Sequence, residues 1–459
     1  MKNREKFSSR LGFILISAGC AVGLGNVWRF PYITGLYGGA AFVILYLVFL
    51  AILGLPIMAM EFSIGRASQK SCAKSFDVLE PKQTKWHLIK YSSIAGNYLL
   101  MMFYTTIGGW MLNYCFKMAF GTFHNINSEE VSAAFSDMLA SPFQNIFWMV
   151  IISIIGFFIC SKGLQNGVEK ISKYMMSFLF VIMLVLVIRA VTLPNAVEGL
   201  KFYLVPDFHK MMENGFGNAI FAAMGQAFFS LSLGMGCLCT YASYFSKETN
   251  LTKTAFSVGI IDTFVAILAG FIIFPAAFSV GIQPGSGPSL IFITLPNVFQ
   301  QAFSGVPILA YIFSVMFYAL LAMAALTSTI SLHEVVTAYL HEEFKFSRGK
   351  AAKLVTGGCI FFGVFCSLSL GVTKEFTVFG LGMFDLFDFV TAKLMLPLGG
   401  LCISLFTGWY LDKKVVWSEI TNNGTLRIPV YRLIVFILKY IAPIAITLIF
   451  INELGFIKL

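Results

Sequence analysis

Charged residues are scarce in this chain of 459 residues: Asp, Glu, Lys and Arg make up 12%, against 58% hydrophobic residues. A soluble domain usually carries about a quarter of its residues as these four types. So little charge cannot cover a water-exposed surface of this size, which excludes a soluble enzyme, a disordered chain and a fibrous repeat. The composition therefore indicates a protein that lies in lipid.

Motifs for catalysis and metal binding are lacking as well. The nine cysteines are odd in number and scattered, with neither a disulfide framework nor a metal-binding spacing. Two His-Glu pairs, beginning at residues 333 and 341, are eight residues apart and do not form the HExxH motif of a zinc protease. The Gly23-x-Gly25 pair lacks the third glycine and the preceding strand of a dinucleotide site. We therefore expect a protein that is not an enzyme.

Long hydrophobic runs are what the chain has in abundance. A helix needs roughly 20 mainly apolar residues to cross a bilayer. Eleven candidate spans lie near residues 11–37, 41–66, 91–121, 143–161, 171–191, 217–244, 254–281, 304–332, 352–371, 389–410 and 432–452. The connections are too short for a further domain. The sequence thus predicts an all-α membrane protein in which residues 1–459 form a single transmembrane domain of eleven transmembrane helices.

The basic residues are unevenly distributed between the two sides of this predicted membrane domain. With the N-terminus inside, 23 of the 32 Lys and Arg residues fall in cytoplasmic segments, as the positive-inside rule requires. An odd number of spans then leaves the C-terminus outside. The net charge of +10 is accordingly a sign of orientation, and we expect no nucleic-acid partner.

Two of the predicted spans are interrupted by closely spaced glycines. The first contains Gly23 and Gly25, and the sixth contains Gly234 and Gly236. Small residues that allow close helix packing are one explanation. However, the two segments are the first and sixth spans, which are corresponding members of two five-span halves. Paired broken helices of this kind indicate a transporter with its binding site at the middle of the membrane.

Four segments carry a resemblance to a known family. They are Gly23-Leu24-Gly25-Asn26-Val27-Trp28-Arg29-Phe30-Pro31-Tyr32, Gln226-Ala227-Phe228-Phe229-Ser230-Leu231-Ser232, Thr240-Tyr241-Ala242-Ser243-Tyr244 and Leu326-Thr327-Ser328-Thr329. With these segments the chain resembles the neurotransmitter:sodium symporter family, in particular its bacterial eleven-span amino-acid branch, and is similar to a bacterial tyrosine transporter. The resemblance implies two inverted five-helix repeats, spans 1–5 (about 11–191) and spans 6–10 (about 217–410). An extra span follows at about 432–452.

The resemblance also implies two Na⁺ sites built from oxygen ligands. Sodium site 1 would use the Ala21 carbonyl, Asn26, Ser230, Asp262 and the substrate carboxylate. Sodium site 2 would use the carbonyls of Gly19, Val22 and Ala324 with the hydroxyls of Thr327 and Ser328. For these two hydroxyls the alternative is an ordinary hydrogen bond to a carbonyl one turn back in their own helix.

Asp262 is an ionisable residue within an apolar run, where such residues are costly and usually functional. Many relatives carry Asn at this position and bind chloride through groups that match Tyr46, Gln226, Ser230 and position 266. Position 266 is Ala here, so we expect the fixed carboxylate to replace chloride and transport to be chloride-independent. A purely structural Asp262 and proton coupling through Asp262 are the alternatives.

The resemblance further implies a substrate pocket between the two breaks. Gly23 leaves room where monoamine-transporting relatives carry Asp, so the substrate must bring its own carboxylate. The mostly apolar lining favours a hydrophobic or aromatic side chain, with tyrosine among the candidates. The predicted substrate-binding residues are Ala21, Gly23, Leu24, Gly25, Leu100, Tyr104, Phe229, Ser230, Ser232, Met235, Ser328 and Leu332.

Two gates follow from the same resemblance. The outer gate pairs Arg29 with Asp388, with Asp385 as a competing acid, and Phe229 and Tyr104 form a lid over the substrate. The inner gate pairs Arg4 with Glu342, braced by Tyr244, and Phe7 replaces a Trp that commonly plugs the inner vestibule.

The resulting hypothesis is a Na⁺-coupled secondary active symporter in a bacterial inner membrane. It would import hydrophobic or aromatic L-amino acids by alternating access, as a monomer or a dimer. An ion channel is a weaker alternative, because channels normally assemble around a symmetry axis with a continuous pore.

Overall fold

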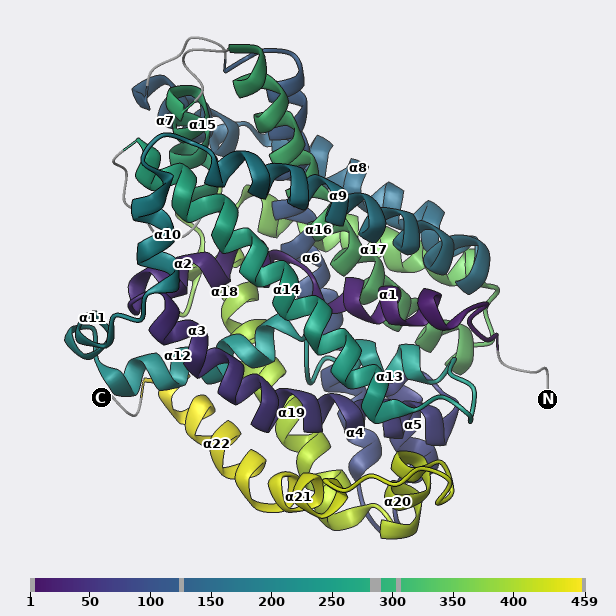
Figure 1. The fold of residues 1–459 in the computed structure, drawn as a ribbon. Helices are drawn as coiled ribbons and strands as arrows, with labels where there is room; N and C mark the ends of the chain where they lie inside the picture. Colours follow the sequence, from purple (N-terminus) through teal and green to yellow (C-terminus); the bar gives the residue numbers. More distant parts are fainter. Residues whose placement is uncertain (1–4, 124–127, 281–289, 303–306, 456–459) are drawn as a thin grey trace.

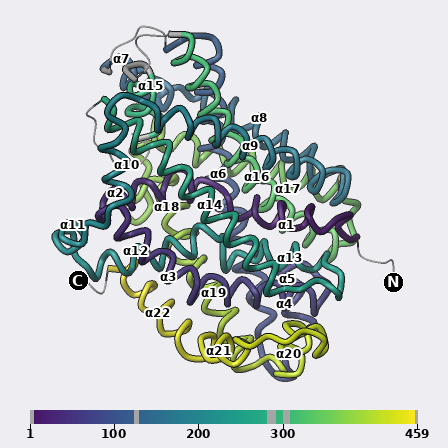
Figure 2. Tube along the Cα trace, viewed as in Figure 1, coloured from purple at the N-terminus to yellow at the C-terminus, as the bar shows by residue number. Residues whose placement is uncertain are grey.

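The computed structural model describes residues 5–123, 128–280, 290–302 and 307–455, and most of these residues lie in helices (Figure 1). The helices run side by side in a thick bundle, and the Cα trace shows α1 passing through its middle (Figure 2). The first described helix begins on the right of Figure 1 and the last one ends on the left, so the two ends of the described chain lie on opposite sides of the molecule.

The first predicted span is a bent pair of helices. α1 (Arg10–Ala21) is capped by Ser9, whose hydroxyl accepts from the Gly12 amide, and it ends where Val22 adopts an extended conformation with ψ 111°. The chain resumes as the π-helical turn η1 (Gly25–Arg29) and then α2 (Phe30–Leu36). The two halves meet at 54°, which confirms the predicted break.

The sixth predicted span is broken as well. α12 (Phe216–Ser230) and α13 (Cys237–Ala242) are separated by the non-helical residues 231–236. Gly234 and Gly236 adopt φ values of +87° and +79°, which residues with a side chain rarely adopt. A Cβ on Gly234 would collide with the Leu396 carbonyl, and one on Gly236 with the Cys72 sulfur. Glycine is therefore required here by both the backbone conformation and close packing.

The other predicted spans are long helices, several of them continued through a π-helical turn. They are α3 (Ala40–Phe49), η2 (Leu50–Gly54) and α4 (Leu55–Ser68); α6 (Ile89–Ala119); α8 (Pro142–Ser161); η4 (Leu164–Glu169) and α9 (Lys170–Val191); α14 (Leu251–Ser279); α16 (Pro307–Glu343); α17 (Arg348–Leu368); α18 (Met383–Asp388), η6 (Phe389–Met395), α19 (Leu396–Leu405) and η7 (Phe406–Tyr410); and α21 (Tyr431–Phe436), η8 (Ile437–Ile441) and α22 (Ala442–Glu453).

Short elements connect these helices. They are α5 (Cys72–Leu79), η3 (Trp86–Leu88), α7 (Ser128–Ala140), α10 (Ala196–Leu204), α11 (Phe208–Glu213), η5 (Leu290–Thr294), α15 (Leu295–Ala302) and α20 (Lys413–Thr421). A small antiparallel hairpin, β1 (Thr377–Val378) and β2 (Leu381–Gly382), precedes α18, with Thr377 opposite Gly382.

The described parts of the predicted spans are mainly helical, which confirms a helical protein with many apolar helices. In the described chain, eight helices are long and apolar enough to cross a membrane, or nine with the bent pair. The eighth predicted span ended at 332, but α16 continues to Glu343, where charged residues extend it beyond the apolar run. α6 and the broken α12–α13 are outside that set, so the count of eleven and the inverted repeats stay predictions.

α6 and α16 pack against each other in the centre, and α1 packs against α14, α9 and α16.

Candidate functional site

Asn26, Ser230 and Asp262 come together from three helical segments beside the two breaks. Asn26 Nδ2 donates to Asp262 Oδ1 at 2.7 Å and to Ser230 Oγ at 3.0 Å, and Ser230 Oγ donates to Asp262 Oδ2 at 2.6 Å. Tyr46 donates to Asp262 Oδ2 and to Ser230 Oγ, both at 3.3 Å. All four side chains are fully buried. The cluster brings hydroxyl and carboxylate oxygens, which are ligands that hard cations prefer, around the amide group of Asn26.

The first break is held in place by this cluster. The Gly23 amide donates to Asn26 Oδ1 at 3.0 Å, so the side chain that reaches Asp262 also fixes the start of the second half-helix. Gln226 Nε2 donates to the Gly25 carbonyl at 2.8 Å, and its Oε1 is buried with no hydrogen-bond partner among the described residues. Ala266, one helical turn after Asp262, is buried and offers no polar side chain. Asp262 therefore supplies the negative charge of this cluster.

A second group of oxygens lies between α1 and α16. Thr327 Oγ1 donates to the Ala324 carbonyl at 3.0 Å and lies 3.5 Å from the Val22 carbonyl. Ser328 Oγ lies 3.4 Å from both of these carbonyls. Gly19 is beside them, since a Cβ there would lie 3.7 Å from Thr327 Cβ. The hydroxyls thus make the helical hydrogen bonds expected of a structural role and also face the broken helix, as the sodium hypothesis requires.

Several predicted substrate residues converge at the first break. A Cβ on Gly23 would collide with Ser328 Oγ and would lie 3.8 Å from the Tyr104 ring. A Cβ on Gly25 would lie 2.8 Å from the Phe229 ring. The two glycines therefore let the backbone approach a hydroxyl and two aromatic rings, and Tyr104 is itself buried.

The second break contributes its own backbone groups. Ser232 adopts φ +52° and donates through Oγ to the Cys20 carbonyl at 3.1 Å, which connects the two breaks directly. The Met235 carbonyl accepts from Asn97 Nδ2 at 2.8 Å, and the Met235 side chain is buried. Leu100 and Leu332 are buried on α6 and α16, which pack against each other.

Glu61 was missing from the predicted site, yet it supports the second break. Its Oε1 accepts from the Gly234 amide at 2.6 Å, and its Oε2 is buried without a hydrogen-bond partner among the described residues. The signal that could have found it is the one used for Asp262, an acid within an apolar run. Glu61 and Asn97 together satisfy backbone groups that the break leaves without helical partners.

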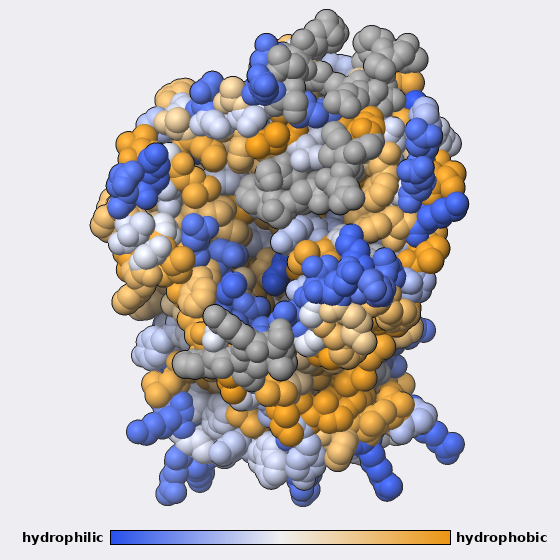
Figure 3. All heavy atoms as spheres, turned by 90° about the vertical axis from the view of Figure 1, so that its left-hand side faces the viewer, coloured by the Kyte–Doolittle hydropathy of each residue, from blue (hydrophilic) through white to orange (hydrophobic). Residues whose placement is uncertain are grey.

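The side of the molecule opposite the start of α1 is hollowed. Figure 3 shows hydrophilic residues deep in this hollow and both hydrophilic and hydrophobic residues at its edge. The Arg29 guanidinium lies over the Phe229 ring, 4.7 Å from its centroid. Among the described residues, no ion pair joins Arg29 to Asp388. Asp388 is half-buried and close enough to interact electrostatically with Arg29, whereas the competing acid Asp385 is exposed. The paired outer gate stays a prediction, and the structure presents it unpaired.

The side on which α1 begins is closed by aromatic and charged side chains. Phe7 packs against Tyr244 and Phe245, with both ring centroids 5.9 Å away. Tyr244 donates to Glu334 Oε1 at 2.8 Å, and Arg348 binds both carboxylate oxygens of Glu334 at 3.0 and 2.5 Å.

The predicted inner gate is only partly described. Arg4 lies outside the described residues, so its pairing with Glu342 stays a prediction. Glu342 accepts from the backbone amide and the hydroxyl of Ser71, the latter at 2.9 Å. The sequence does not predict the Glu334–Arg348 pair, whose partners are 14 residues apart on two helices.

Comparisons with known proteins agree with this geometry. The chain matches the sequence model of the sodium:neurotransmitter symporter family over residues 4–129 and 123–458. It is 34% identical to the sodium-dependent transporter YhdH of Bacillus subtilis over 455 residues, covering 99% of this chain and 98% of the relative. A sodium-dependent transporter of Haemophilus influenzae is 35% identical over 463 residues, with 99% of each chain covered. Among solved structures, MhsT in complex with L-phenylalanine matches with a TM-score of 0.87 and 40% identity, over 98% of this chain and 100% of that chain. The chain therefore belongs to the sodium:neurotransmitter symporter family.

Proposed function

We propose that this protein is a Na⁺-coupled symporter that imports hydrophobic or aromatic L-amino acids, tyrosine among them, by alternating access and without chloride. It would lie in a bacterial inner membrane as eleven spans, with the N-terminus in the cytoplasm, the C-terminus outside and two inverted five-helix repeats. It would not be an enzyme. In this orientation the hollowed side faces outward and the side where α1 begins faces the cytoplasm.

The observation that carries the proposal is the meeting of two broken helices with two groups of oxygen atoms. A broken helix exposes carbonyls at the end of one half and amides at the start of the other. Carbonyls and polar side chains suit Na⁺, and amides at a helix start suit a carboxylate. We assign Na⁺ site 1 to Ala21, Asn26, Ser230 and Asp262. We assign Na⁺ site 2 to Gly19, Val22, Ala324, Thr327 and Ser328.

The substrate class follows from what surrounds the breaks. Residues 22–24 and 231–236, which form the two breaks, include no acidic side chain that could bind a substrate amine. Leu24 and Gly25 begin the second half-helix of span 1, whose amides would bind the substrate carboxylate. The apolar residues Leu100, Phe229, Met235 and Leu332 would contact the substrate side chain. A structure of MhsT, a solved relative, holds L-phenylalanine, which supports an aromatic substrate here.

The energetics suit uphill uptake. One charge that moves inward across 100 mV releases about 2.3 kcal/mol, so two Na⁺ ions release roughly twice that before their concentration gradient is added. Alternating access would come from spans 1, 2, 6 and 7 moving against the remaining spans, with the two breaks as hinges.

The test is uptake of labelled tyrosine, phenylalanine, tryptophan and leucine into proteoliposomes that contain the purified protein. Gradients of Na⁺, H⁺ and Cl⁻ are imposed one at a time. We expect concentrative uptake that requires inward Na⁺ and persists when gluconate replaces chloride. Uptake driven by H⁺ alone would favour the alternative, proton coupling through Asp262. A Na⁺ current that persists without any amino acid and does not saturate would favour a channel.

A further inference from the structure

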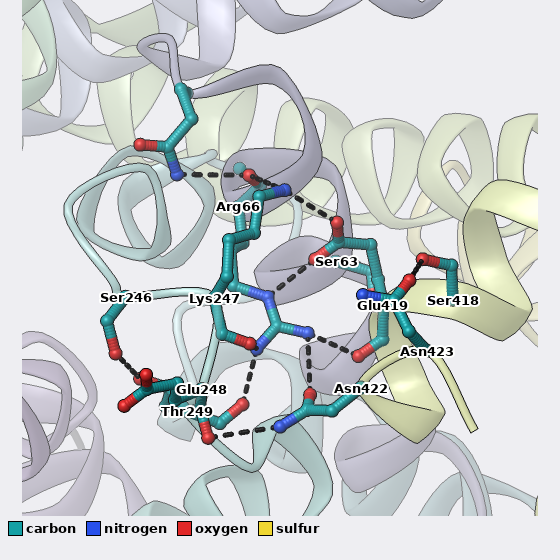
Figure 4. A network of polar contacts seen from close by, with 12 residues as sticks. Ser63, Arg66, Ser246, Lys247, Glu248, Thr249, Ser418, Glu419, Asn422 and Asn423 are labelled. Atoms are coloured by element: carbon teal, nitrogen blue, oxygen red, sulfur yellow. Dashed lines mark hydrogen bonds and ion pairs between the residues drawn. The ribbon is translucent and has the colours of Figure 1, made fainter. Parts of the chain in front are cut away.

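A polar network joins three segments on the cytoplasmic side that are remote in sequence. Figure 4 shows Arg66 at the end of α4, Lys247 and Thr249 in the connection between α13 and α14, and Glu419 on α20. Arg66 is almost completely buried, with 1% of its side chain exposed, and Glu419 has 8% exposed. Such burial of a charged pair is unusual and needs many compensating contacts. We call these side chains, with Asn422, the Arg66 cluster.

All three nitrogens of the Arg66 guanidinium donate hydrogen bonds within the cluster. Its Nε donates to Glu419 Oε2 at 2.5 Å. One terminal nitrogen binds the carbonyls of Lys247 and Thr249, and the other binds the Glu419 carbonyl and Asn422 Oδ1 (Figure 4). Because most of these acceptors are backbone carbonyls, Arg66 fixes the relative position of the three chain segments as well as their charges.

Glu419 is the carboxylate that two cations of the cluster share. Lys247 Nζ donates to Glu419 Oε1 at 2.8 Å and to the Arg66 carbonyl at 3.0 Å. Asn422 adds a further tie, since its Nδ2 donates to the Glu248 carbonyl at 3.0 Å. Loss of the carboxylate would leave the buried guanidinium without its counter-charge, whereas Lys247, with 58% of its side chain exposed, would keep its contact with solvent.

The helix that carries Glu419 is joined to the chain by non-helical residues on both sides. Before α20, Leu411 is extended, with ψ 138°. After it, Asn422, Asn423 and Gly424 all have positive φ, between +48° and +85°. α20 packs against α4 and α14, which are spans 2 and 7 of the proposed topology. α20 therefore packs against two of the four spans that move in the proposed transport cycle.

We propose that α20, the end of α4 and the 247–249 connection form a single rigid unit during transport, and that Glu419 is the positioning residue that holds it together. The inference rests on the proposed alternating access and adds to it: α20 moves with spans 2 and 7, although it lies in the chain between spans 10 and 11. The chain before Lys413 and after Asn422 then changes conformation, while the unit itself does not. Glu419 contacts neither proposed ion site, so it acts on the rate of the conformational step.

The functional test compares Glu419→Gln with Glu248→Gln in proteoliposomes. Glu248 is exposed in the same connection, and only its backbone carbonyl takes part in the network. We expect E419Q to lower maximal uptake about fivefold, with the KM for the amino acid and for Na⁺ changed less than about twofold, because coupling residues outside a site alter conformational steps. E248Q should behave as the unaltered protein. Maximal uptake that E419Q leaves unchanged, or a loss confined to KM, would overturn the proposal.

A distance measurement on the otherwise unaltered protein tests the rigid unit independently of how E419Q folds. Spin labels are introduced as non-natural amino acids at the exposed positions Lys414 on α20, Lys253 on α14 and Lys353 on α17. On exchange of Na⁺ for K⁺, we expect the 414–253 distance distribution to stay constant and the 414–353 distribution to shift. Equal shifts in both pairs, or a shift in neither, would overturn the inference. Absence of Na⁺-driven uptake by the unaltered protein would instead refute the proposed function.

Discussion

At the scale of single residues, Asp262 carries the strongest functional argument. Its carboxylate accepts hydrogen bonds from Asn26, Ser230 and Tyr46, so three polar side chains from three segments are organised around one buried charge. A buried carboxylate is costly even when it is hydrogen-bonded, and the cost is offset when a cation binds beside it. Gln226 Oε1, buried without a partner among the described residues, lies on the same α12 as Ser230.

The first prediction concerns this charge. Asp262→Asn keeps the shape of the side chain and removes its charge, so we expect Na⁺-driven uptake without chloride to fall at least about tenfold, which corresponds to about 1.4 kcal/mol. Chloride should restore part of the uptake, because an anion near Tyr46 and Gln226 can supply the missing charge. The measurement is initial uptake in chloride and in gluconate. Glu198→Gln, an exposed acid on α10, is the control; full activity of D262N in gluconate would contradict the prediction.

The second prediction separates a sodium ligand from an ordinary helical hydrogen bond. Thr327 and Thr329 are both buried on α16, and both donate to a carbonyl of their own helix, at 3.0 and 2.8 Å. Of the two, Thr327 also faces the Val22 carbonyl across the break. Replacing an oxygen that binds a charged group costs about 1.5–3 kcal/mol. We therefore expect Thr327→Val to raise the Na⁺ concentration for half-maximal uptake at least about tenfold.

Thr329→Val is the matched control, since it removes the same hydroxyl from the same helix away from the break. It should change the half-maximal Na⁺ concentration less than about twofold, because only a helical hydrogen bond is lost. Sodium titrations of uptake measure both variants. Equal effects of the two substitutions would show that the hydroxyl of Thr327 is structural.

Individual residues also show where sequence reasoning succeeds and fails. Asp262 stands out in the sequence because an acid within an apolar run is rare. Its partner Asn26 is 236 residues away, and only the resemblance to a family, not periodicity or spacing, brought the two together. Glu61 sits in an apolar run too and was overlooked. Arg66 and Arg348 are among the basic residues expected in cytoplasmic segments, whereas in the structure 1% and 14% of their side chains are exposed and tertiary packing pairs them with acids.

At the scale of helices, the break in the sixth predicted span is determined by its glycines. Gly234 combines φ +87° with a position where a Cβ would collide with the Leu396 carbonyl on α19. Its amide is held by Glu61 and the carbonyl of the next residue by Asn97. The broken segment is therefore held in this conformation by hydrogen bonds to α4 and α6 and by close packing against α19.

The third prediction tests this requirement. Gly234→Ala should lower the free energy of unfolding by at least about 2 kcal/mol, because it adds backbone strain and a steric clash. We expect a lower Tm in detergent and loss of uptake. Gly225→Ala is the control within α12: its Cβ would meet no described atom within 4 Å, and alanine stabilises a helix interior by up to about 1 kcal/mol relative to glycine. Similar Tm values for the two variants would contradict the prediction.

Helices were the most predictable feature of the fold, because a bilayer requires long apolar runs with internally satisfied backbones. Both breaks were predictable from paired glycines. Helix lengths were less so: α16 extends eleven residues beyond its predicted end at 332, and residues 333–338 of this extension are buried, so it is stabilised by packing against other helices. Short connecting helices such as α20 were missed, since they are stabilised by contacts with other helices and carry weak patterns of their own.

At the scale of the whole molecule, the two sides differ in how they are closed. One side is hollowed, and Arg29 there stacks on Phe229 without an ion pair to Asp388 in the described chain. The opposite side is closed by Phe7, by the Glu334–Arg348 pair and by the Arg66 cluster. This asymmetry is that of a transporter open toward the outside, if the basic residues face the cytoplasm as the positive-inside rule requires. Opening inward must then break the hydrogen bond that Tyr244, at the end of the sixth predicted span, donates to Glu334 on α16.

The fourth prediction follows from that requirement. Arg348→Gln leaves Glu334, which is fully buried in the closed state, without its cation, and loss of one partner of a buried pair costs about 3–5 kcal/mol. The cost falls when the inner side opens, because water can then reach the carboxylate. The population should therefore shift toward the state that opens inward.

Arg348 also donates to the carbonyl of buried Cys160, so this thiol should become accessible when the pair is lost. We expect its rate of labelling by a maleimide from the cytoplasmic side to rise at least about tenfold, whereas Lys353→Gln, an exposed position on the same helix, should leave it unchanged. A labelling rate in R348Q equal to that of the unaltered protein would show that the Glu334–Arg348 pair does not close the inner side.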